Sequence, residues 1–161
     1  MTYSSRPETW DHIYRVRYFL ERAIHDLHDR SDVHDASKLV EPELEAFDRM
    51  TPRLNEVEYG TEEYKAAVRE LGPALKHHFE NNDHHPEHYE NGIRGMSLMA
   101  LIEMLCDWRA ASERTKQRFD DPDKVKSFSE TSLAYNQKRF GYSDELASIL
   151  DNTARELGMY D

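Results

Sequence analysis

Cysteine is nearly absent from this sequence, with Cys106 alone among 161 residues. A single cysteine excludes a disulfide within one chain, which is typical of proteins from a reducing compartment. Long apolar runs are also lacking, because the longest, MSLMALIEMLCDW, contains Glu103 and is too short to span a bilayer. The first residues, MTYSSRPETWDH, do not include the apolar segment of a signal peptide. We therefore expect a cytoplasmic protein that acts away from membranes.

Positively charged residues are fewer than negatively charged ones. Lys and Arg total 21 against 32 Asp and Glu, which gives a formal net charge of −11. Such a field repels phosphate polymers, so we expect no nucleic-acid polymer as a partner. A small anionic substrate is compatible with this charge, because a bound metal can invert the potential locally. The sequence favours no particular oligomeric state.

Strand-like alternation, internal repeats and low-complexity tracts are absent, whereas apolar residues recur at helical spacing. The pattern predicts an all-α fold of about six helices, a compact bundle in a single domain over residues 1–161. The predicted helices cover residues 9–29, 42–50, 61–78 with a break at Gly72-Pro73, 98–118, 123–140 and 144–158. The predicted caps are Thr9, Ser97 and Ser143 at helix starts and Gly141 at a helix end.

Five of the nine histidines lie in the short stretch HHFENNDHHPEHY, residues 77–89. A metal site and a solvated polar loop both explain such a stretch. His78 and His85 are seven residues apart, so they share a helix face if the helix continues between them. His84 then points elsewhere, and Asn82, four residues after His78, could orient a ligand. His77 would face away from His78 into solvent.

Three His-Asp dipeptides occur in the N-terminal quarter of the chain. His25 and His28 begin the first two on the charged side of the first helix, where surface histidines are the simpler interpretation. The third pair, His34-Asp35, lies past that helix and is followed by Ala-Ser-Lys. One helical turn would place the Lys38 ammonium beside a metal at this pair.

Two further candidate ligands lie in strongly apolar segments. His12 shares a helix face with Val16 and Phe19, where a buried structural histidine is the alternative. Asp107 lies in the most hydrophobic helix, with Glu103 four residues earlier on the same side. The alternative for Asp107 is a partly exposed carboxylate that pairs with a nearby arginine.

The candidate ligand set therefore contains four imidazoles and two carboxylates. Its members are His12, His34, Asp35, His78, His85 and Asp107. Such a set suits Mn, Fe, Co, Ni or Zn better than Ca or Mg, which prefer oxygen ligands alone. It exceeds the needs of one tetrahedral zinc, so one or two ions with open positions are expected.

These residues resemble the ordered H…HD…D signature of the HD-domain superfamily, an all-α fold. The resemblance assigns His12, His34-Asp35 and Asp107 to the signature and His78 and His85 to a second metal. More narrowly, the chain is similar to a group of short phage and bacterial proteins that share HDxSK, HxxxNxHH and EMxxDW. The seven-residue spacing of His78 and His85 is shorter than usual in HD enzymes, so either His84 or His85 could be the ligand.

The resemblance implies a metal-dependent phosphohydrolase that acts on a small phosphoester, most simply a nucleotide. Lys38 and Asp35 would be its catalytic residues, with Lys38 neutralising charge that develops as the ester breaks. Residues expected to contact substrate or support the ligands are His84, Asn82, Glu103 and His88. A di-iron oxygenase of the same fold and a metal-stabilised helical binding protein are the alternatives.

Overall fold

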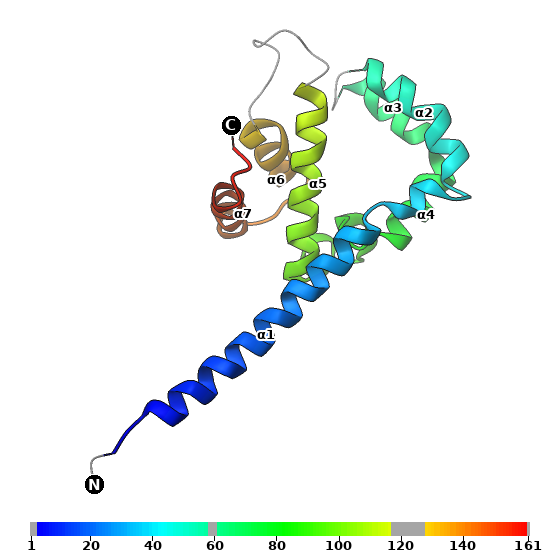
Figure 1. Ribbon diagram of the computed structural model, residues 1–161. Coiled ribbons are helices and arrows are strands. Elements are labelled where there is room, and N and C mark those ends of the chain that lie inside the picture. Colours follow the sequence, from blue (N-terminus) through cyan, green and yellow to red (C-terminus); the bar gives the residue numbers. More distant parts are fainter. Residues whose placement is uncertain (1–2, 58–60, 117–127, 161) are drawn as a thin grey trace. The chain divides into compact units, whose positions relative to one another are not determined.

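The structure, a computed structural model, describes residues 3–57, 61–116 and 128–160, and every regular element among them is helical (Figure 1). The predicted all-α class is therefore confirmed. The chain divides into two units, Met1–His34 and Asp35–Asp161, which are described separately. The single domain over residues 1–161 stays a prediction. Among the described residues, no helix has the length and apolar character needed to cross a membrane.

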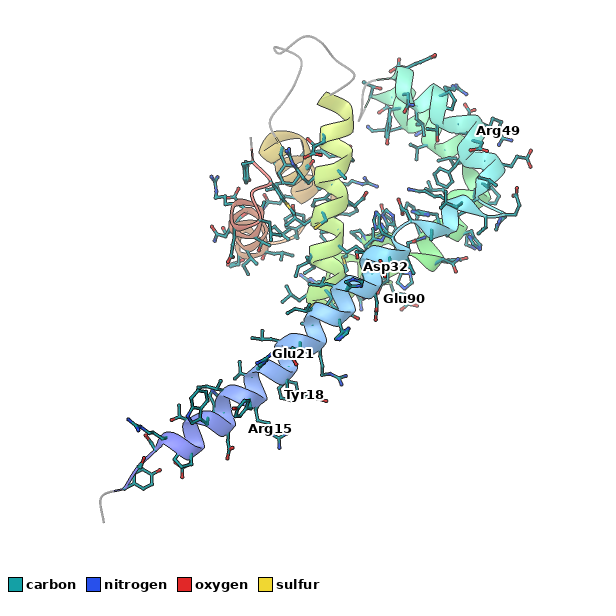
Figure 2. The ribbon with its side chains drawn as sticks, in the orientation of Figure 1. Arg15, Tyr18, Glu21, Asp32, Arg49 and Glu90 are labelled. Atoms are coloured by element: carbon teal, nitrogen blue, oxygen red, sulfur yellow. The ribbon has the colours of Figure 1, made fainter. Side chains whose placement is uncertain are left out.

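The first unit consists of one helix, α1 (Arg6–Val33). Figure 2 labels Arg15, Tyr18 and Glu21 along it. The helix begins earlier than predicted: Ser5 is the N-cap, and Pro7 occupies the first turn, where a missing N–H is harmless. Thr9, the predicted cap, lies inside the helix and donates its hydroxyl to the Ser5 carbonyl at 2.9 Å. A lone helix buries no side chain by itself, so the predicted burial of His12 stays a prediction.

The second unit contains the remaining helices. In chain order they are the 3-10 helix η1 (Ala36–Leu39), α2 (Leu44–Glu56), α3 (Glu62–Glu70), α4 (Gly72–Asn81), the 3-10 helices η2 (Pro86–His88) and η3 (Gly92–Gly95), α5 (Leu98–Lys116), the π-helix η5 (Ser129–Ala134), α6 (Tyr135–Phe140) and α7 (Asp144–Glu156). The predicted break between α3 and α4 is confirmed at Gly72, whose φ of 47° is left-handed. The start of the predicted helix 123–140 lies outside the described residues.

Helix α2 differs from its prediction because it continues through Pro52 to Glu56. Proline inside a helix removes a backbone hydrogen bond and normally favours an end. Here Met50 before the proline and Leu54 after it both pack in one apolar cluster with Ala67 and Leu71. Packing on both sides of the proline holds the helix together, which local propensity could not reveal.

The larger core lies where α5 packs with α7 and the segment around Phe128. Met104 and Leu105 of α5 and Ala154 of α7 are fully buried in it. Trp108 is partly buried and stacks on Phe140, with ring centroids 6.2 Å apart, so it packs against this core. The caps at the ends of these helices are also as predicted: Ser97 and Ser143 accept backbone N–H groups, and Gly141 is left-handed.

Candidate metal site

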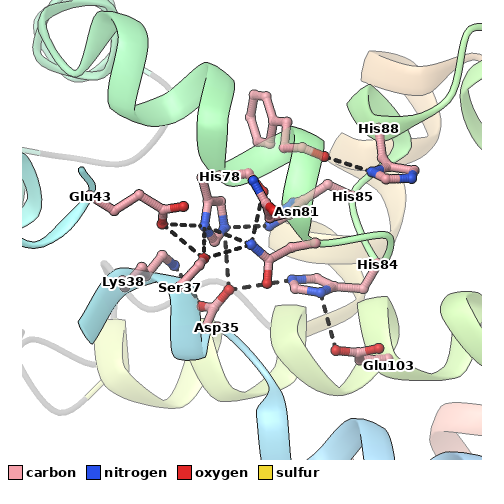
Figure 3. A network of polar contacts seen from close by, with 12 residues as sticks. Asp35, Ser37, Lys38, Glu43, His78, Asn81, His84, His85, His88 and Glu103 are labelled. Atoms are coloured by element: carbon pink, nitrogen blue, oxygen red, sulfur yellow. Dashed lines mark hydrogen bonds and ion pairs between the residues drawn. The ribbon is translucent and has the colours of Figure 1, made fainter. Parts of the chain in front are cut away.

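Three segments of the second unit bring histidine and aspartate side chains together. Asp35 precedes η1, His78 lies near the end of α4, and His84 and His85 follow in the turn after α4 (Figure 3). One donor atom from each of the four lies within 4.8 Å of the others. His78 and His84 are each 1% exposed. Part of the segment that the sequence marked as histidine-rich is therefore buried, and His88 in the same segment is exposed.

The donor atoms are spaced as the ligands of one ion would be. The His78 Nε2 atom lies 3.2 Å from Asp35 Oδ1 and 2.9 Å from His85 Nε2. His84 Nε2 lies 3.6 Å from the same Asp35 oxygen. A tetrahedral ion with bonds of about 2.1 Å separates its ligand atoms by about 3.4 Å. The cluster can therefore accept a transition-metal ion with small movements of its side chains.

A turn, and not a continuing helix, brings His84 and His85 to His78. Helix α4 ends at Asn81, and Asn82 is already extended at φ −127° and ψ 99°. His85 is extended at φ −94° and ψ 130°, because Pro86 disfavours the helical conformation of the residue before it. The expectation of a shared helix face was wrong, although His78 and His85 do meet. The open choice between His84 and His85 also changes, since the structure brings both into the cluster.

Asp35 has an unusual backbone conformation. Its φ of 56° is left-handed, the only positive φ of a non-glycine residue among those described. Aspartate tolerates this region better than most residues, but it still costs about 1–2 kcal/mol. Such strain is common at functional sites, where surrounding contacts enforce it. Here Lys38 donates to Asp35 Oδ2 at 2.6 Å, which leaves Oδ1 on the side of His78 and His84.

Glu43 supports His78 through Nδ1, the ring nitrogen on the side away from the other donors. This carboxylate is 0% exposed, and its Oε2 accepts from His78 Nδ1 at 2.9 Å and from Ser37 at 3.0 Å. Its Oε1 lies 2.7 Å from His77 Nδ1, so His77 faces Glu43 and is not the free surface residue that we expected. Burial alone would raise the pKa of Glu43, but hydrogen bonds from His77, His78 and Ser37 hold it below its usual range. Sequence reasoning missed Glu43.

Glu103 supports His84 in the same way from α5. Its Oε1 lies 3.1 Å from His84 Nδ1, and its side chain is 12% exposed. A carboxylate behind a ligating imidazole fixes the ring and leaves the opposite nitrogen as the donor toward a metal. The supporting role of Glu103 stays a prediction. Asn82 also lies beside His78, with its amide nitrogen 3.1 Å from Nδ1.

His85 is held in the neutral form. Burial, together with the charges of neighbouring His84 and His78, lowers the pKa of His85 to about 3, against smaller opposing effects of Asp107 and Asp35. A neutral imidazole has a lone pair for a metal and does not add positive charge to the site. His85 therefore needs no deprotonation to act as a ligand near neutral pH.

The other predicted site residues are placed as follows. Asp107 on α5 has a carboxylate oxygen within 4.8 Å of one from Asp35. His88 is exposed and its Nδ1 contacts the carbonyl of Phe79 at 2.8 Å, away from the four clustered donors. His12 and His34 belong to the first unit, and their roles as ligands stay predictions.

The chain belongs to a family of unknown function, DUF5662, whose model matches residues 1–156. This match carries no assignment to the HD superfamily. No curated protein and no solved structure matches the chain.

Proposed function

We propose that this member of DUF5662 is a metal-dependent hydrolase of small phosphoesters, with nucleotides as the first class to test. Asp35, His78, His84 and His85 would hold the metal. The observation that carries the proposal is the convergence of these four donors, two of them backed by buried or nearly buried carboxylates. A histidine-rich set of this kind favours Mn, Fe, Co, Ni or Zn over Ca or Mg.

The four donors fit a catalytic ion better than a structural one. A structural zinc site is usually closed by four thiolate or imidazole ligands, whereas one ligand here is a carboxylate and no cysteine contributes. When bound, such an ion would supply a polarised phosphate oxygen and a water of lowered pKa. Asp107 is close enough to Asp35 to serve as a further carboxylate ligand, as the resemblance to HD proteins implies.

Lys38 supports the choice of a phosphate substrate. An ammonium carries three donors, and one of them contacts Asp35 Oδ2. Its Nζ also lies 5.1 Å from the centre of the Phe47 ring, which fixes the charge beside the cluster. The side chain is 33% exposed, so the remaining donors can meet a phosphate oxygen that arrives from solvent. This is the role that the resemblance to HD proteins implies for Lys38.

The test is metal analysis of untagged protein followed by phosphate release from a panel of nucleotides and other phosphomonoesters. We expect about one or two transition-metal ions per chain and metal-dependent release from at least one substrate. Two irons with visible absorption and no phosphate release would favour the oxygenase instead. Protein that binds metal but releases no phosphate from any substrate, and shows no absorption of a di-iron centre, would favour the metal-stabilised binding protein.

A further inference from the structure

The hydrogen bonds behind His78 define where its proton lies. Three polar atoms surround His78 Nδ1: Glu43 Oε2 at 2.9 Å, the Asn82 amide nitrogen at 3.1 Å and Ser37 Oγ at 3.3 Å. Only one of them can share the single proton or lone pair of Nδ1. Which one does so decides whether Nδ1 carries a proton, and therefore which ring nitrogen is left for a metal.

Asn82 and Ser37 use their protons elsewhere. The Asn82 amide has two hydrogens, and it donates at 2.8 Å both to the His78 carbonyl and to Ser37 Oγ. Ser37 has one hydrogen, and the ionised Glu43 is its acceptor at 3.0 Å. Neither residue has a further hydrogen for His78 Nδ1. Glu43 is therefore the partner of Nδ1, and an ionised carboxylate can only accept.

His78 must then carry its proton on Nδ1. The opposite tautomer would place the Nδ1 lone pair 2.9 Å from a buried carboxylate oxygen, with no hydrogen between two acceptors. Leaving a buried acceptor without its donor costs about 1–3 kcal/mol, and more for a charged group. With a proton on Nδ1, Nε2 is the ring nitrogen that remains available to a metal, and it faces Asp35 Oδ1 and His85 Nε2, 3.2 Å and 2.9 Å away.

His77 completes the set of donors to Glu43. Its Nδ1 lies 2.7 Å from Oε1, and its Nε2 lies 3.3 Å from the Asn81 amide nitrogen, which can donate to it. The carboxylate thus accepts from two histidines and one serine across its two oxygens. This explains how a fully buried glutamate stays ionised, since three hydrogen bonds replace its hydration.

We propose that Glu43 is a positioning residue of the metal site, which fixes the His78 ring and its Nδ1–H tautomer so that Nε2 is presented as a ligand. The proposal rests on the metal binding proposed above for His78. Glu43 touches neither metal nor substrate in this role and acts through His78 alone. His77 and Ser37 hold the carboxylate in place.

The test compares Glu43→Gln with Glu80→Gln, a matched change at an exposed position of α4 where the carboxylate pairs with Lys76. Glutamine keeps the shape of Glu43 but presents an N–H group to one of its donors. Zinc titrations should show about 10- to 100-fold weaker binding in Glu43→Gln, the usual effect of losing such a group, and no change in Glu80→Gln. Wild-type zinc affinity in Glu43→Gln would overturn the proposal.

A second measurement separates positioning from general stability. Nitrogen-15 NMR of imidazoles in chelator-treated protein should show His78 as Nδ1–H in wild type and a mixture of tautomers in Glu43→Gln. An Nε2–H tautomer in wild type overturns the proposal even if Glu43→Gln does not fold. An affinity loss in Glu43→Gln without any change of tautomer also overturns it. Because this measurement needs no metal, an Nδ1–H His78 in a protein that binds none would contradict the proposed function and not the action of Glu43 on the ring.

Discussion

The two sides of the histidine cluster are built differently. His78 lies on a regular helix, and its ring is held by Glu43, Ser37 and Asn82, all of them hydrogen-bonded to one another or to His78. His84 and His85 lie on a turn, where Glu103 supports His84. The helix side is thus held by this polar network, and on the turn side Pro86 also sets the backbone conformation of His85. The difference implies that supporting groups matter more on the helix side.

Removing each histidine in turn is the strongest test of this difference. Both His78→Ala and His84→Ala should weaken zinc binding by more than roughly 100-fold, because each removes a ligand and not only a supporting group. His78→Ala should also lower the free energy of unfolding of chelator-treated protein by about 1–3 kcal/mol, since buried Glu43 loses a donor. His84→Ala should cost less, because Glu103 is 12% exposed and can reach water. Equal costs in urea unfolding would remove the distinction.

A substitution at Lys38 tests Asp35, the donor of the cluster that belongs to neither the helix side nor the turn side. Lys38→Met should keep its metal, because the lysine holds Asp35 Oδ2 and not Oδ1, the oxygen that faces His78. Turnover of a phosphoester substrate should fall on the order of 10²-fold, the usual scale for losing one charge contact in the transition state. Metal analysis and phosphate release are measured on one preparation. Unchanged turnover would remove Lys38 from the mechanism, and loss of metal would make it a structural residue.

The supporting carboxylates allow a finer comparison. Glu103→Gln should weaken zinc binding by about 10-fold, the lower end of the range for such groups, and less than Glu43→Gln. Glu103 is 12% exposed, so water can partly replace its contact with His84, whereas Glu43 is fully buried and accepts from two histidines and a serine. Calorimetric titration of both variants with zinc gives the order directly. A larger loss of zinc affinity in Glu103→Gln than in Glu43→Gln would mean that supporting groups matter more on the turn side.

Acid sensitivity gives a further comparison. The pKa of His85 falls from about 6.5 in the unfolded chain to about 3 in the fold, so the unfolded state binds more protons between these values. Stability from neutral His85 is therefore complete above pH ~6.5 and is lost as pH falls toward 3, by at most about 1.4 kcal/mol per pH unit. The lowered pKa of Glu43 adds its own loss only at lower pH, below its unfolded value near 4.5.

Urea unfolding of chelator-treated protein between pH 5 and 7 isolates the His85 contribution. His85→Gln should show a shallower dependence of unfolding free energy on pH than wild type over this range. The same slope in both proteins would mean that His85 is not held neutral in the fold. Urea unfolding of Glu80→Gln provides the surface control at each pH.

The sequence predicted the helices where local signals agree. Ser97, Ser143 and Gly141 mark the ends of helices through their own backbone or side-chain geometry, so they could be read directly. The predicted end of α2 before Pro52 was wrong, because apolar contacts with α3 on both sides of the proline outweigh the lost backbone hydrogen bond. Tertiary contacts of this kind cannot be predicted from the residues next to a proline in the sequence.

The candidate site shows the same limit. Its members Asp35, His78 and His85 could be named from residue type and spacing, because few side chains bind transition metals. His84 was placed beside them only as a supporting residue, since a regular helix would have turned it away and the actual turn does not. Glu43 could not be found, because it is one of many glutamates in an acidic chain and only the fold brings it to His78.

Glu43 has a second structural role, since it is also the N-cap residue of α2. Its carbonyl accepts the Phe47 amide at 2.9 Å, while its side chain holds His78. The start of one helix and the end of another are thus joined through a single residue, so fraying of the first turn of α2 must also release His78. Any ligand of the histidine cluster would therefore slow amide hydrogen exchange at Phe47, far along the chain from the histidines.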